Sequence, residues 1–393
     1  MAKKFNYDVC IVGGLGHVGL PLGILFASKG LNVSLYDINN KFSKLVQQGT
    51  MPFMERKAQP LLKKIIKNKK LNISLVNKTI KESKYIIISI GTLIDKKKEP
   101  ATKLFITTIK KLSKFLNKSQ FLIIRSSVYP GTCSKIYNLL KSKNFSNISY
   151  CPERIQQGHS LEELKKFPQI VSGFNKLSIK ESSKLFKKIS PKIIISSVQE
   201  VELMKLFTNA WRYTQFAISN EFFMMCEDKG ISYKNVRNIM IDNYDRAKNI
   251  PKAGFAAGPC LYKDTLQLSH YFNKNFKIGN SAIHINDNLP NYLVKKLILK
   301  YKLKTKTIGI LGMAFKANID DIRNSLSIKL KKLLKNKCNK VLCSDEYIKN
   351  KNYISKEELI KLSDIIIIGA PHMQYKRVNF EKKTIINIWE NEI

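Results

Sequence analysis

Short apolar runs recur through the first half of the chain, and most of them end in glycine or a polar residue. Runs of this length predict buried strands, and the longer stretches between them predict helices. The lysine-rich stretch 57–81 predicts a helix and a short strand. Strands that alternate with helices are typical of a parallel α/β sheet. The other strands are predicted at 8–13, 32–36, 85–90, 121–125 and 147–150, with shorter runs at 170–171 and 193–195.

The pattern becomes helical over residues 199–229, where apolar side chains recur at helical spacing and Gly230 marks a stop. A second α/β unit follows, and it includes a helix opened by residues 320–325. We predict an α/β protein with two Rossmann-like, doubly wound domains, joined by a long central helix and a helical dimerisation region. The remaining predicted elements are helices at 266–271 and 289–301 and strands at 307–311, 340–343, 364–368 and 384–388. The predicted domains are residues 1–197, 198–303 and 304–393.

Composition and charge narrow the classes of protein. The chain has 393 residues, 44% of them hydrophobic, and a formal net charge of +40. The positive excess is almost entirely lysine, spread along the chain without arginine-rich tracts or aromatic–basic interleaving. This pattern indicates solvated surfaces and no nucleic-acid partner. A basic nucleic-acid-binding protein built on a dinucleotide fold is the alternative.

The seven cysteines form no Cys-x-x-Cys motif and no ligand-like spacing with the five histidines. Reduced thiols in the cytoplasm are therefore predicted, with no disulfide and no metal. The longest apolar runs, such as 365–368, are too short to cross a bilayer. Residues 1–4 lead directly into a strand pattern. We therefore expect neither membrane insertion nor a signal peptide.

A Gly-x-Gly-x-x-Gly motif at residues 14–19 lies between the first predicted strand and a helix, and Asp37 ends the next strand. This context predicts a dinucleotide site with the pyrophosphate at the helix N-terminus. Gly14 would allow the tight turn, Gly16 the approach to the pyrophosphate, and Gly19 the packing of the helix. Asp37 would accept from ribose hydroxyls and repel a 2′-phosphate, which predicts NAD over NADP. The predicted contacts are Gly14, Gly16, His17, Val18, Gly19 and Asp37.

Other candidate residues follow the ends of predicted strands. Gly91 and Thr92 follow one strand, and Thr132 follows another after a Pro-Gly turn. Ligands of open α/β sheets lie beyond these ends, so all three are predicted on the cofactor side, although either threonine could instead cap a helix. Glu153 follows a further strand beside Pro152, where it is well placed for acid–base chemistry. The alternative for Glu153 is a surface ion pair with its neighbour or a lysine.

A loop of small residues at 253–264 delivers Cys260, with Asp264 four positions later. Small residues let a backbone approach a ligand, and the N–H groups at a helix start favour a thiolate. Cys260 is predicted as a nucleophile; a buried structural cysteine is the alternative. Lys205 and Asn209 lie four residues apart on one face of the central helix. Together they would stabilise an oxyanion, whereas Lys205 alone could be a surface lysine.

Taken together, these motifs resemble those of the nucleotide-sugar 6-dehydrogenases, the family that oxidises UDP-glucose, GDP-mannose and UDP-N-acetylmannosamine. The resemblance covers essentially the whole chain, with the motifs in the same order. The matching segments are 14–19 with Asp37, 126–132, 152–154, 205–209 through 220–221, 254–264 and 315–323.

The resemblance implies an NAD-dependent, four-electron oxidation of sugar C6 to a carboxylate, through a thiohemiacetal and a thioester on Cys260. It implies that Lys205 and Asn209 stabilise oxyanions and that Asp264 acts with a water in proton transfer. Glu153 would be the general base in thioester hydrolysis, and Thr132 would position water or cofactor. The product would serve surface polysaccharide synthesis. The implied substrate contacts are Arg154, Lys205, Asn209, Phe255, Gly258, Lys316 and, from a neighbouring subunit, Arg246, while Arg323 would lie at the cofactor between the nucleotide domains.

The substrate prediction depends on departures from the UDP-glucose pattern. Many UDP-glucose enzymes have Phe and a second Glu where this chain has Arg154 and Gln157. Ala256 and Ala257 also replace expected glycines. We therefore expect UDP-N-acetylmannosamine or UDP-N-acetylglucosamine. UDP-glucose, and a two-electron dehydrogenase that stops at an aldehyde or ketone, are the alternatives. The long helix and the trans role implied for Arg246 predict a homodimer or a multiple of it.

Overall fold

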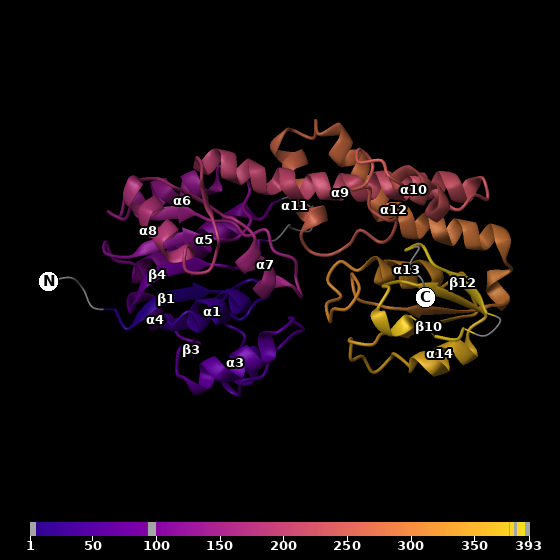
Figure 1. Cartoon of the computed structure of the whole chain (residues 1–393), viewed down its shortest axis with the longest axis horizontal. Helices are drawn as coiled ribbons and strands as arrows, with labels where there is room; N and C mark the ends of the chain where they lie inside the picture. The colour runs from indigo at the N-terminus through magenta and orange to yellow at the C-terminus, as the bar shows by residue number, and fades with distance from the viewer. Residues whose placement is uncertain (1–4, 93–99, 377, 381–382, 390–393) are drawn as a thin grey trace. The chain divides into compact units, whose positions relative to one another are not determined.

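The computed structural model describes residues 5–92, 100–376, 378–380 and 383–389 (Figure 1). The chain divides into two compact units, Met1–Leu206 and Phe207–Ile393. Within the described ranges, no helix combines the length and the apolar character that a membrane crossing needs. The predicted α/β class is confirmed, with mainly parallel sheets and a long central helix. The three-domain division stays a prediction.

The first unit is built on a sheet with strand order β3-β2-β1-β4-β5-β6-β7-β8. Strands β3 to β6 run parallel, β7 is antiparallel to β6, and β8 is parallel to β7. This is the doubly wound order. Successive strands are added outward from β1 on one side of the sheet and from β4 on the other. The strands are β1 (Tyr7–Val12), β2 (Val33–Tyr36), β3 (Leu71–Ser74), β4 (Ser83–Ile88), β5 (Phe121–Ile124), β6 (Ile148–Tyr150), β7 (Gln169–Gly173) and β8 (Ile193–Ile195).

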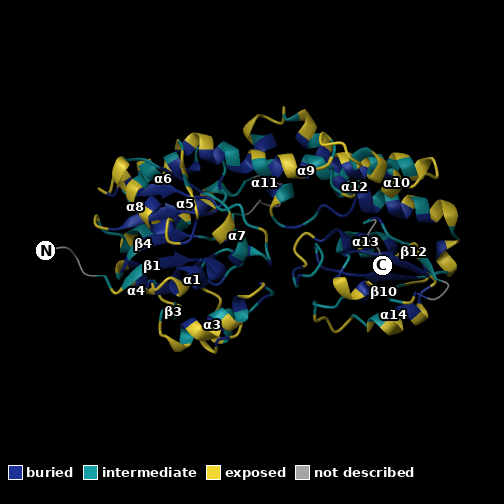
Figure 2. Ribbon diagram, viewed as in Figure 1, coloured by how far each residue is buried: buried dark blue, intermediate teal, exposed yellow. Residues whose placement is uncertain are grey.

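Helices connect these strands, and the central strands are buried on both faces, as Figure 2 shows in dark blue. Consecutive apolar residues in β4 and β5 suit this position, because side chains on both faces of the sheet must be apolar. Asn39 and Asn175 cap two of the helices through side-chain hydrogen bonds. The helices are α1 (Gly19–Ser28), α2 (Asn40–Gln47), α3 (Ala58–Lys67), α4 (Lys78–Lys81), α5 (Thr102–Leu112), α6 (Thr132–Lys141), α7 (Ser160–Lys166) and α8 (Lys176–Phe186), with a 3-10 turn η1 (Ser113–Phe115).

A single helix, α9 (Val198–Asp228), covers the predicted central helix. The second unit continues with α10 (Tyr233–Ile241), α11 (Leu261–Tyr271) and α12 (Lys277–Lys300). Two of these helices begin before the predicted runs at 266–271 and 289–301. Helix α11 starts directly after Cys260, and α12 starts at Lys277 and continues through Pro290. A proline inside a helical pattern usually marks a boundary, and here it does not.

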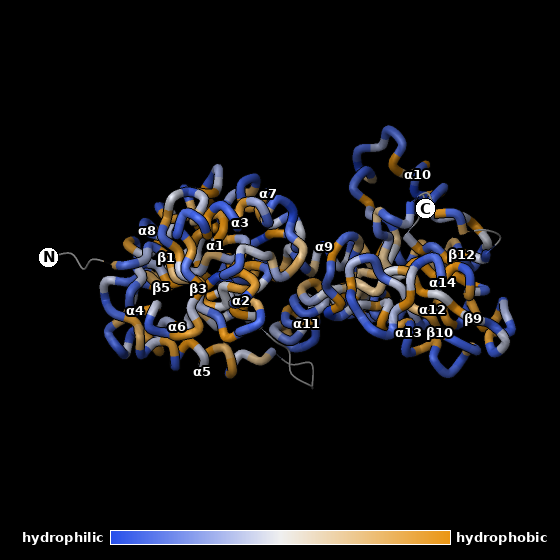
Figure 3. Tube along the Cα trace, turned by 90° about the horizontal axis from the view of Figure 1, so that it is seen from below, coloured by the Kyte–Doolittle hydropathy of each residue, from blue (hydrophilic) through white to orange (hydrophobic). Residues whose placement is uncertain are grey.

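The second unit ends in a parallel sheet with strand order β10-β9-β11-β12. Ser325 caps the helix α13, which confirms that residues 320–325 open a helix. Hydrophilic segments lie on the outer side of both units, as Figure 3 shows in blue. The elements are η2 (Leu303–Thr305), β9 (Thr307–Leu311), α13 (Leu326–Leu334), β10 (Lys340–Ser344), α14 (Lys356–Leu362), β11 (Ile365–Ile368), η3 (Met373–Tyr375) and β12 (Thr384–Ile386).

Candidate active site

The glycine motif forms a tight turn between β1 and α1. The left-handed backbone of this turn lies at Gly13, with φ +77°, one residue before the motif. A Cβ at Gly13 would meet the Ser89 carbonyl oxygen at 2.7 Å, and one at Gly19 would meet the Gly13 oxygen at 2.4 Å. Only the Gly13 oxygen, at 3.5 Å, would lie within 4 Å of a Cβ at Gly16. The turn is therefore packed against protein at Gly13 and Gly19, and open to a ligand at Gly16.

Asp37 stands beside this turn at the end of β2. Its Oδ2 accepts from the Leu15 N–H at 3.0 Å, and its Oδ1 accepts from the Asn39 N–H at 3.0 Å. Each oxygen keeps a second lone pair for a ribose hydroxyl. Among the described residues, no side chain caps α1 and no acid occupies its first turn. An open helix start next to a carboxylate fits the pyrophosphate and ribose of NAD.

The neighbouring residues His17 and Val18 also take defined positions. The His17 ring packs on Phe53, with centroids 4.0 Å apart, and Val18 is the residue that precedes α1. At the ends of β4 and β5, the Thr92 hydroxyl donates to the Ser127 carbonyl at 2.6 Å. Gly91 is exposed next to it. These residues therefore line the carboxyl edge of the sheet, as the sequence predicts.

Thr132 is the first residue of α6 and is buried. In the part of the chain that the structure describes, its hydroxyl has no hydrogen-bond partner. Glu202 holds the backbone on both sides, since its carboxylate accepts from Gly131 N–H at 2.7 Å and Cys133 N–H at 2.9 Å. Glu202 is a site residue that was not predicted from the sequence. Its spacing of three from Lys205 on one helix face was an available signal.

Glu153 and Lys205 form a buried pair. Lys205 Nζ lies 2.7 Å from the Glu153 carbonyl oxygen and 3.3 Å from its Oε1. The side chains are 5% exposed for Lys205 and 12% for Glu153, which removes the alternatives of a surface lysine and a surface ion pair. Arg154 instead donates to the Pro168 carbonyl at 2.8 Å. Both members of the pair are therefore held where β6 ends.

A second buried cation supports the same strand end. Arg125 donates to the Cys151 carbonyl at 3.1 Å and to Gln169 Oε1 at 3.0 Å. Burial lowers the pKa of Arg125 to about 10, while the charge of Glu153 acts in the opposite direction. The sequence predicts Arg125 only as the last residue of a strand. No motif marks a lone arginine at that place as a support for Glu153.

Cys260 is exposed and immediately precedes α11, so the predicted helix start is confirmed. The alternative of a buried structural cysteine is wrong for this residue. The thiol stands at the positive end of the helix, where backbone N–H groups stabilise a thiolate. Asp264, in the first turn of α11, donates its backbone N–H to the Cys260 carbonyl at 2.9 Å. The nucleophile candidate and the carboxylate therefore share one helical turn.

Asp264 is fully buried and has two polar partners. Asn209 Nδ2 lies 2.5 Å from its Oδ2, and Lys263 Nζ pairs with its Oδ1. The Lys263 side chain is 11% exposed. Lys263 has no role in the sequence-based prediction, because neighbouring residues on a helix rarely face each other. Asp264 is therefore a buried carboxylate compensated by an adjacent ammonium and an amide.

The loop before Cys260 packs tightly against aromatic residues that follow strands of the β10-β9-β11-β12 sheet. Gly254 has φ +151°, and a Cβ there would meet Trp389 Cε3 at 2.3 Å. A Cβ at Gly258 would meet the Phe315 ring at 2.7 Å. The Phe255 ring is buried edge-on against Trp389, with centroids 6.2 Å apart. Small residues are required here by packing inside the protein, a reason that the sequence did not reveal.

Asn220 clamps the same loop from α9. Its Oδ1 accepts from the Gly254 N–H at 2.8 Å, and its Nδ2 donates to the Gly254 carbonyl at 3.0 Å. The same Nδ2 lies 2.8 Å from Asn286 Oδ1. Both asparagines are fully buried. This clamp fixes the backbone of the cysteine loop six residues before the thiol.

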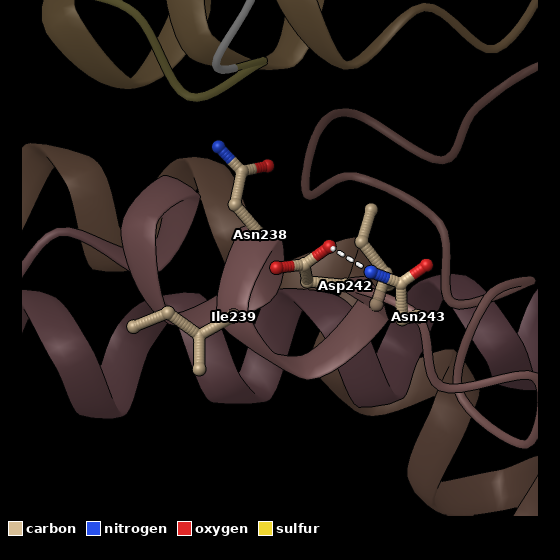
Figure 4. Close-up of a pocket in the computed structure, with 5 residues that line it drawn as sticks. Asn238, Ile239, Asp242 and Asn243 are labelled. Atoms are coloured by element: carbon tan, nitrogen blue, oxygen red, sulfur yellow. Dashed lines mark hydrogen bonds between the residues drawn. The ribbon is translucent and has the colours of Figure 1, made fainter.

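The remaining candidates lie elsewhere. Lys316 is half-buried in the loop after β9, and Arg323 pairs with Asp321 at 2.6 Å. Arg246 is exposed in the turn after α10. A hollow of about 490 Å³ lies at the end of α10 and is lined by Asn238, Ile239, Ile241, Asp242 and Asn243. Figure 4 labels four of these residues. None of the predicted site residues lines this hollow.

Three models of the UDP-glucose/GDP-mannose dehydrogenase family match the chain. The NAD binding domain matches residues 7–190, the central domain 199–288 and the UDP binding domain 309–389. The UDP-N-acetyl-D-mannosamine dehydrogenase of Methanocaldococcus jannaschii is 29% identical over 97% of this chain and 88% of its own length. The UDP-glucose 6-dehydrogenase of Rickettsia felis is 30% identical over 94% of this chain and 87% of its own length.

The fold agrees with these similarities. A solved structure of a UDP-D-ManNAc dehydrogenase from Pyrococcus horikoshii superposes with a TM-score of 0.90, at 25% identity, over 98% of this chain and 95% of that one. The glycine turn and Asp37 lie within residues 7–190, which match the NAD binding domain. The chain therefore belongs to the UDP-glucose/GDP-mannose dehydrogenase family and is an NAD-dependent oxidoreductase.

Proposed function

We propose that the protein oxidises the C6 hydroxymethyl group of a UDP-N-acetylhexosamine to a carboxylate. The observation that carries this proposal is the exposed Cys260 at the start of α11, one turn from the buried Asp264. A thiol in this position can hold an aldehyde covalently, so that a second oxidation follows before the intermediate escapes. NAD supplies the acceptor for one hydride in each of the two oxidations.

The sequence of bonds follows from this chemistry. Removal of the first hydride and the hydroxyl proton leaves an aldehyde, and the Cys260 thiolate adds to its carbon to form a thiohemiacetal. Loss of the second hydride and of the hydroxyl proton gives a thioester. A water then attacks the thioester carbon, the C–S bond breaks, and the carboxylate and Cys260 thiol are released. One sugar therefore requires two NAD and one water.

Lys205 and Asn209 would stabilise the oxyanions of these steps. Lys205 has three N–H donors, and two of its contacts are to Glu153. Asn209 donates one of its two amide N–H groups to Asp264. Each side chain thus keeps capacity for one further donation to a developing negative charge. Glu153 would take the proton of the attacking water.

Two features support an N-acetylhexosamine substrate. Arg154, next to Glu153, could donate to an acetamido carbonyl, and the relatives from Methanocaldococcus jannaschii and Pyrococcus horikoshii are named UDP-N-acetyl-D-mannosamine dehydrogenases. The second candidate is UDP-glucose, favoured by the 30% identity to the enzyme of Rickettsia felis. A site that pairs an acetamido group rejects an analogue that lacks it, since buried polar groups are then left unpaired.

A panel of nucleotide sugars separates these candidates. NADH formation is measured with UDP-ManNAc, UDP-GlcNAc, UDP-glucose, UDP-galactose and GDP-mannose, and NADH is counted per sugar consumed. We expect turnover with a UDP-N-acetylhexosamine and two NADH per sugar. Turnover confined to UDP-glucose would contradict the substrate proposal alone. One NADH per sugar would contradict the cysteine mechanism.

We also propose a homodimer that works in the cytoplasm. Trp211, Ile218 and Met225 recur every seven residues along α9 and are 63%, 43% and 58% exposed. Positions seven apart share one helix face, so these side chains form an apolar stripe that a second copy could cover. Arg246 would then reach a neighbouring site. No disulfide joins any of the seven cysteines, all of which lie in the described ranges, and this suits a reducing compartment.

Sedimentation tests the dimer. The double variant Trp211→Lys/Ile218→Lys should shift the protein towards monomer and reduce activity. Leu299→Lys, which changes an 84% exposed residue at the end of α12, is the control and should change neither. A fully active monomer would remove both the dimer and the trans role of Arg246.

A further inference from the structure

The loop between β9 and α13 carries Lys316, which the family resemblance implies as a substrate contact and which we include in the proposed site. This loop follows the carboxyl end of β9, where open α/β sheets bind their ligands. Lys316 is half-buried, and the backbone on either side of it is anchored. Ala314 lies two residues before it and Asn318 two residues after. Both anchors lead to one buried acid–histidine pair.

Asp345 is the acid of this pair, directly after β10, and its side chain is fully buried. Its Oδ2 accepts from the Met313 and Ala314 N–H groups at 2.6 and 2.9 Å, and its Oδ1 accepts from Tyr347 and Ile348. Burial acts to raise the pKa of Asp345, but the hydrogen bond from its histidine partner, together with those from backbone N–H groups, holds it below its ordinary value. The carboxylate therefore fixes the start of the loop.

His372 is the second member and is also fully buried. Its Nε2 lies 3.1 Å from Asp345 Oδ2, and its Nδ1 lies 2.8 Å from the Asn318 backbone nitrogen. A backbone N–H can only donate, so the hydrogen-bond network assigns a bare Nδ1 and a proton on Nε2. Asn318 Oδ1 in turn accepts from the Met373 N–H at 2.9 Å. His372 therefore fixes the middle of the loop.

The first unit offers a contrast. Asp37 also follows the second strand of its sheet and accepts from a loop N–H, but it is only half-buried and can still accept from a ribose. Asp345 in the second unit has its lone pairs occupied by four N–H groups and His372. The acid that would bind ribose in one domain is thus used for loop geometry in the other.

We propose that Asp345 and His372 are positioning residues that hold the Lys316 loop in the shape that binds the diphosphate of a nucleotide. The pair touches no substrate itself and acts through Ala314 and Asn318. This inference rests on the proposed role of Lys316. A lysine whose backbone is anchored on both sides loses less freedom on binding a phosphate, which raises affinity.

Two substitutions of His372 separate its two hydrogen bonds. His372→Gln can keep a donor near Nε2 for Asp345 but loses the acceptor for Asn318. His372→Asn can keep the acceptor near Nδ1 but loses the donor. We expect His372→Gln to weaken UDP binding about tenfold, which is the change expected for one lost buried hydrogen bond. His372→Asn should retain most of the wild-type UDP affinity.

UDP binding to the full chain is measured by titration calorimetry, with NADH binding as an internal reference that should not change. Asp364→Asn is the control. Asp364 accepts from the Thr307 N–H at 2.7 Å, at the opposite end of β9, so its loss should lower stability and leave UDP affinity unchanged. If His372→Gln does not fold, Asn318→Gly tests the second hydrogen bond that holds the middle of the loop, because glycine tolerates the φ of +57° but lacks the Oδ1 that accepts from the Met373 N–H.

Equal UDP affinity in wild type and in a folded His372→Gln or Asn318→Gly variant would overturn the inference. Equal weakening by His372→Gln and His372→Asn would also overturn it, because it would indicate a general packing role. A wild-type protein that does not bind UDP would contradict the proposed substrate class instead, so the two failures are distinguishable.

Discussion

The Lys205 ammonium donates to the backbone carbonyl of Glu153 at 2.7 Å and lies 3.3 Å from the carboxylate of the same residue. One lysine therefore fixes both the backbone and the charge of the proposed general base. Because both side chains are nearly buried, neither can be removed without leaving the other charge uncompensated. This relationship makes the hydrolysis step separable from the oxidation steps by mutation.

Glu153→Gln should allow both oxidations and slow thioester hydrolysis by a factor of about 10²–10⁴. The expected record is a burst of two NADH per active site followed by slow turnover. Intact-protein mass spectrometry should detect the sugar bound to Cys260. Normal steady-state turnover without a burst would show that Glu153 is not the base.

Cys260→Ala should abolish carboxylate formation and leave NADH affinity intact, because Cys260 belongs to the second unit and the glycine turn to the first. The matched control is Cys226→Ala, which changes a half-buried thiol on α9. We expect near-normal carboxylate production from the control. Product formed by Cys260→Ala at the wild-type rate would contradict covalent catalysis.

Asp264→Ala should destabilise the protein by about 3–5 kcal/mol, because the buried Lys263 ammonium loses its counter-charge. Urea unfolding measures this free energy. Asp245→Ala is the control, since Asp245 pairs with Lys248 at an exposed position and should have little effect. A small effect of Asp264→Ala would show that water reaches Lys263.

Gly254→Ala should cost roughly 1–3 kcal/mol and reduce activity, because its Cβ would overlap Trp389. Gly230→Ala isolates the backbone contribution: Gly230 has φ +68°, with nothing within 4 Å of a Cβ. We expect the smaller effect there. Trp389→Leu should partly rescue Gly254→Ala in a double-mutant cycle. Additive losses would contradict the clash.

The lowered pKa of Asp345 predicts how the free energy of unfolding changes in acid. Its pKa in the folded chain lies below the ordinary value of 3.8, so its contribution is fully present above pH 3.8 and is lost as the pH falls through the folded pKa. Asp345→Asn should therefore be less stable than wild type at neutral pH, and the difference should shrink in this acid range. Urea unfolding at a series of pH values measures it. A difference that is independent of pH would contradict this sign.

Local signals in the sequence predicted much of the fold and part of the site. The strand–turn–helix context located the glycine motif and Asp37, and the small-residue loop located Cys260 at a helix start. These features depend on neighbours within a few residues. The position of the left-handed residue at Gly13 was missed, since it depends on β4 packing behind the turn.

Contacts between distant segments could not be read from the pattern. Glu153 and Lys205 are 52 residues apart in the sequence. The spacing of charges alone could not distinguish an acid–base role for Glu153 from a surface ion pair. The close approaches at Gly254 and Gly258 come from the aromatic rings of Trp389 and Phe315, so packing inside the protein is a reason for small residues that the sequence did not reveal. Lys263 was overlooked because its partner is the next residue.

The contact between Gly254 and Trp389 also sets an order of assembly. The residue that supports the cysteine loop is made 135 positions after the glycine that rests on it. Domains fold largely as units during synthesis, starting from the N-terminus. A growing chain can therefore complete its glycine turn early. The Cys260 loop lacks its contact with Trp389 until the C-terminal sheet has folded. The Cys260 loop thus reaches its final packing only after the earlier part of the chain, with its glycine turn, has already been made.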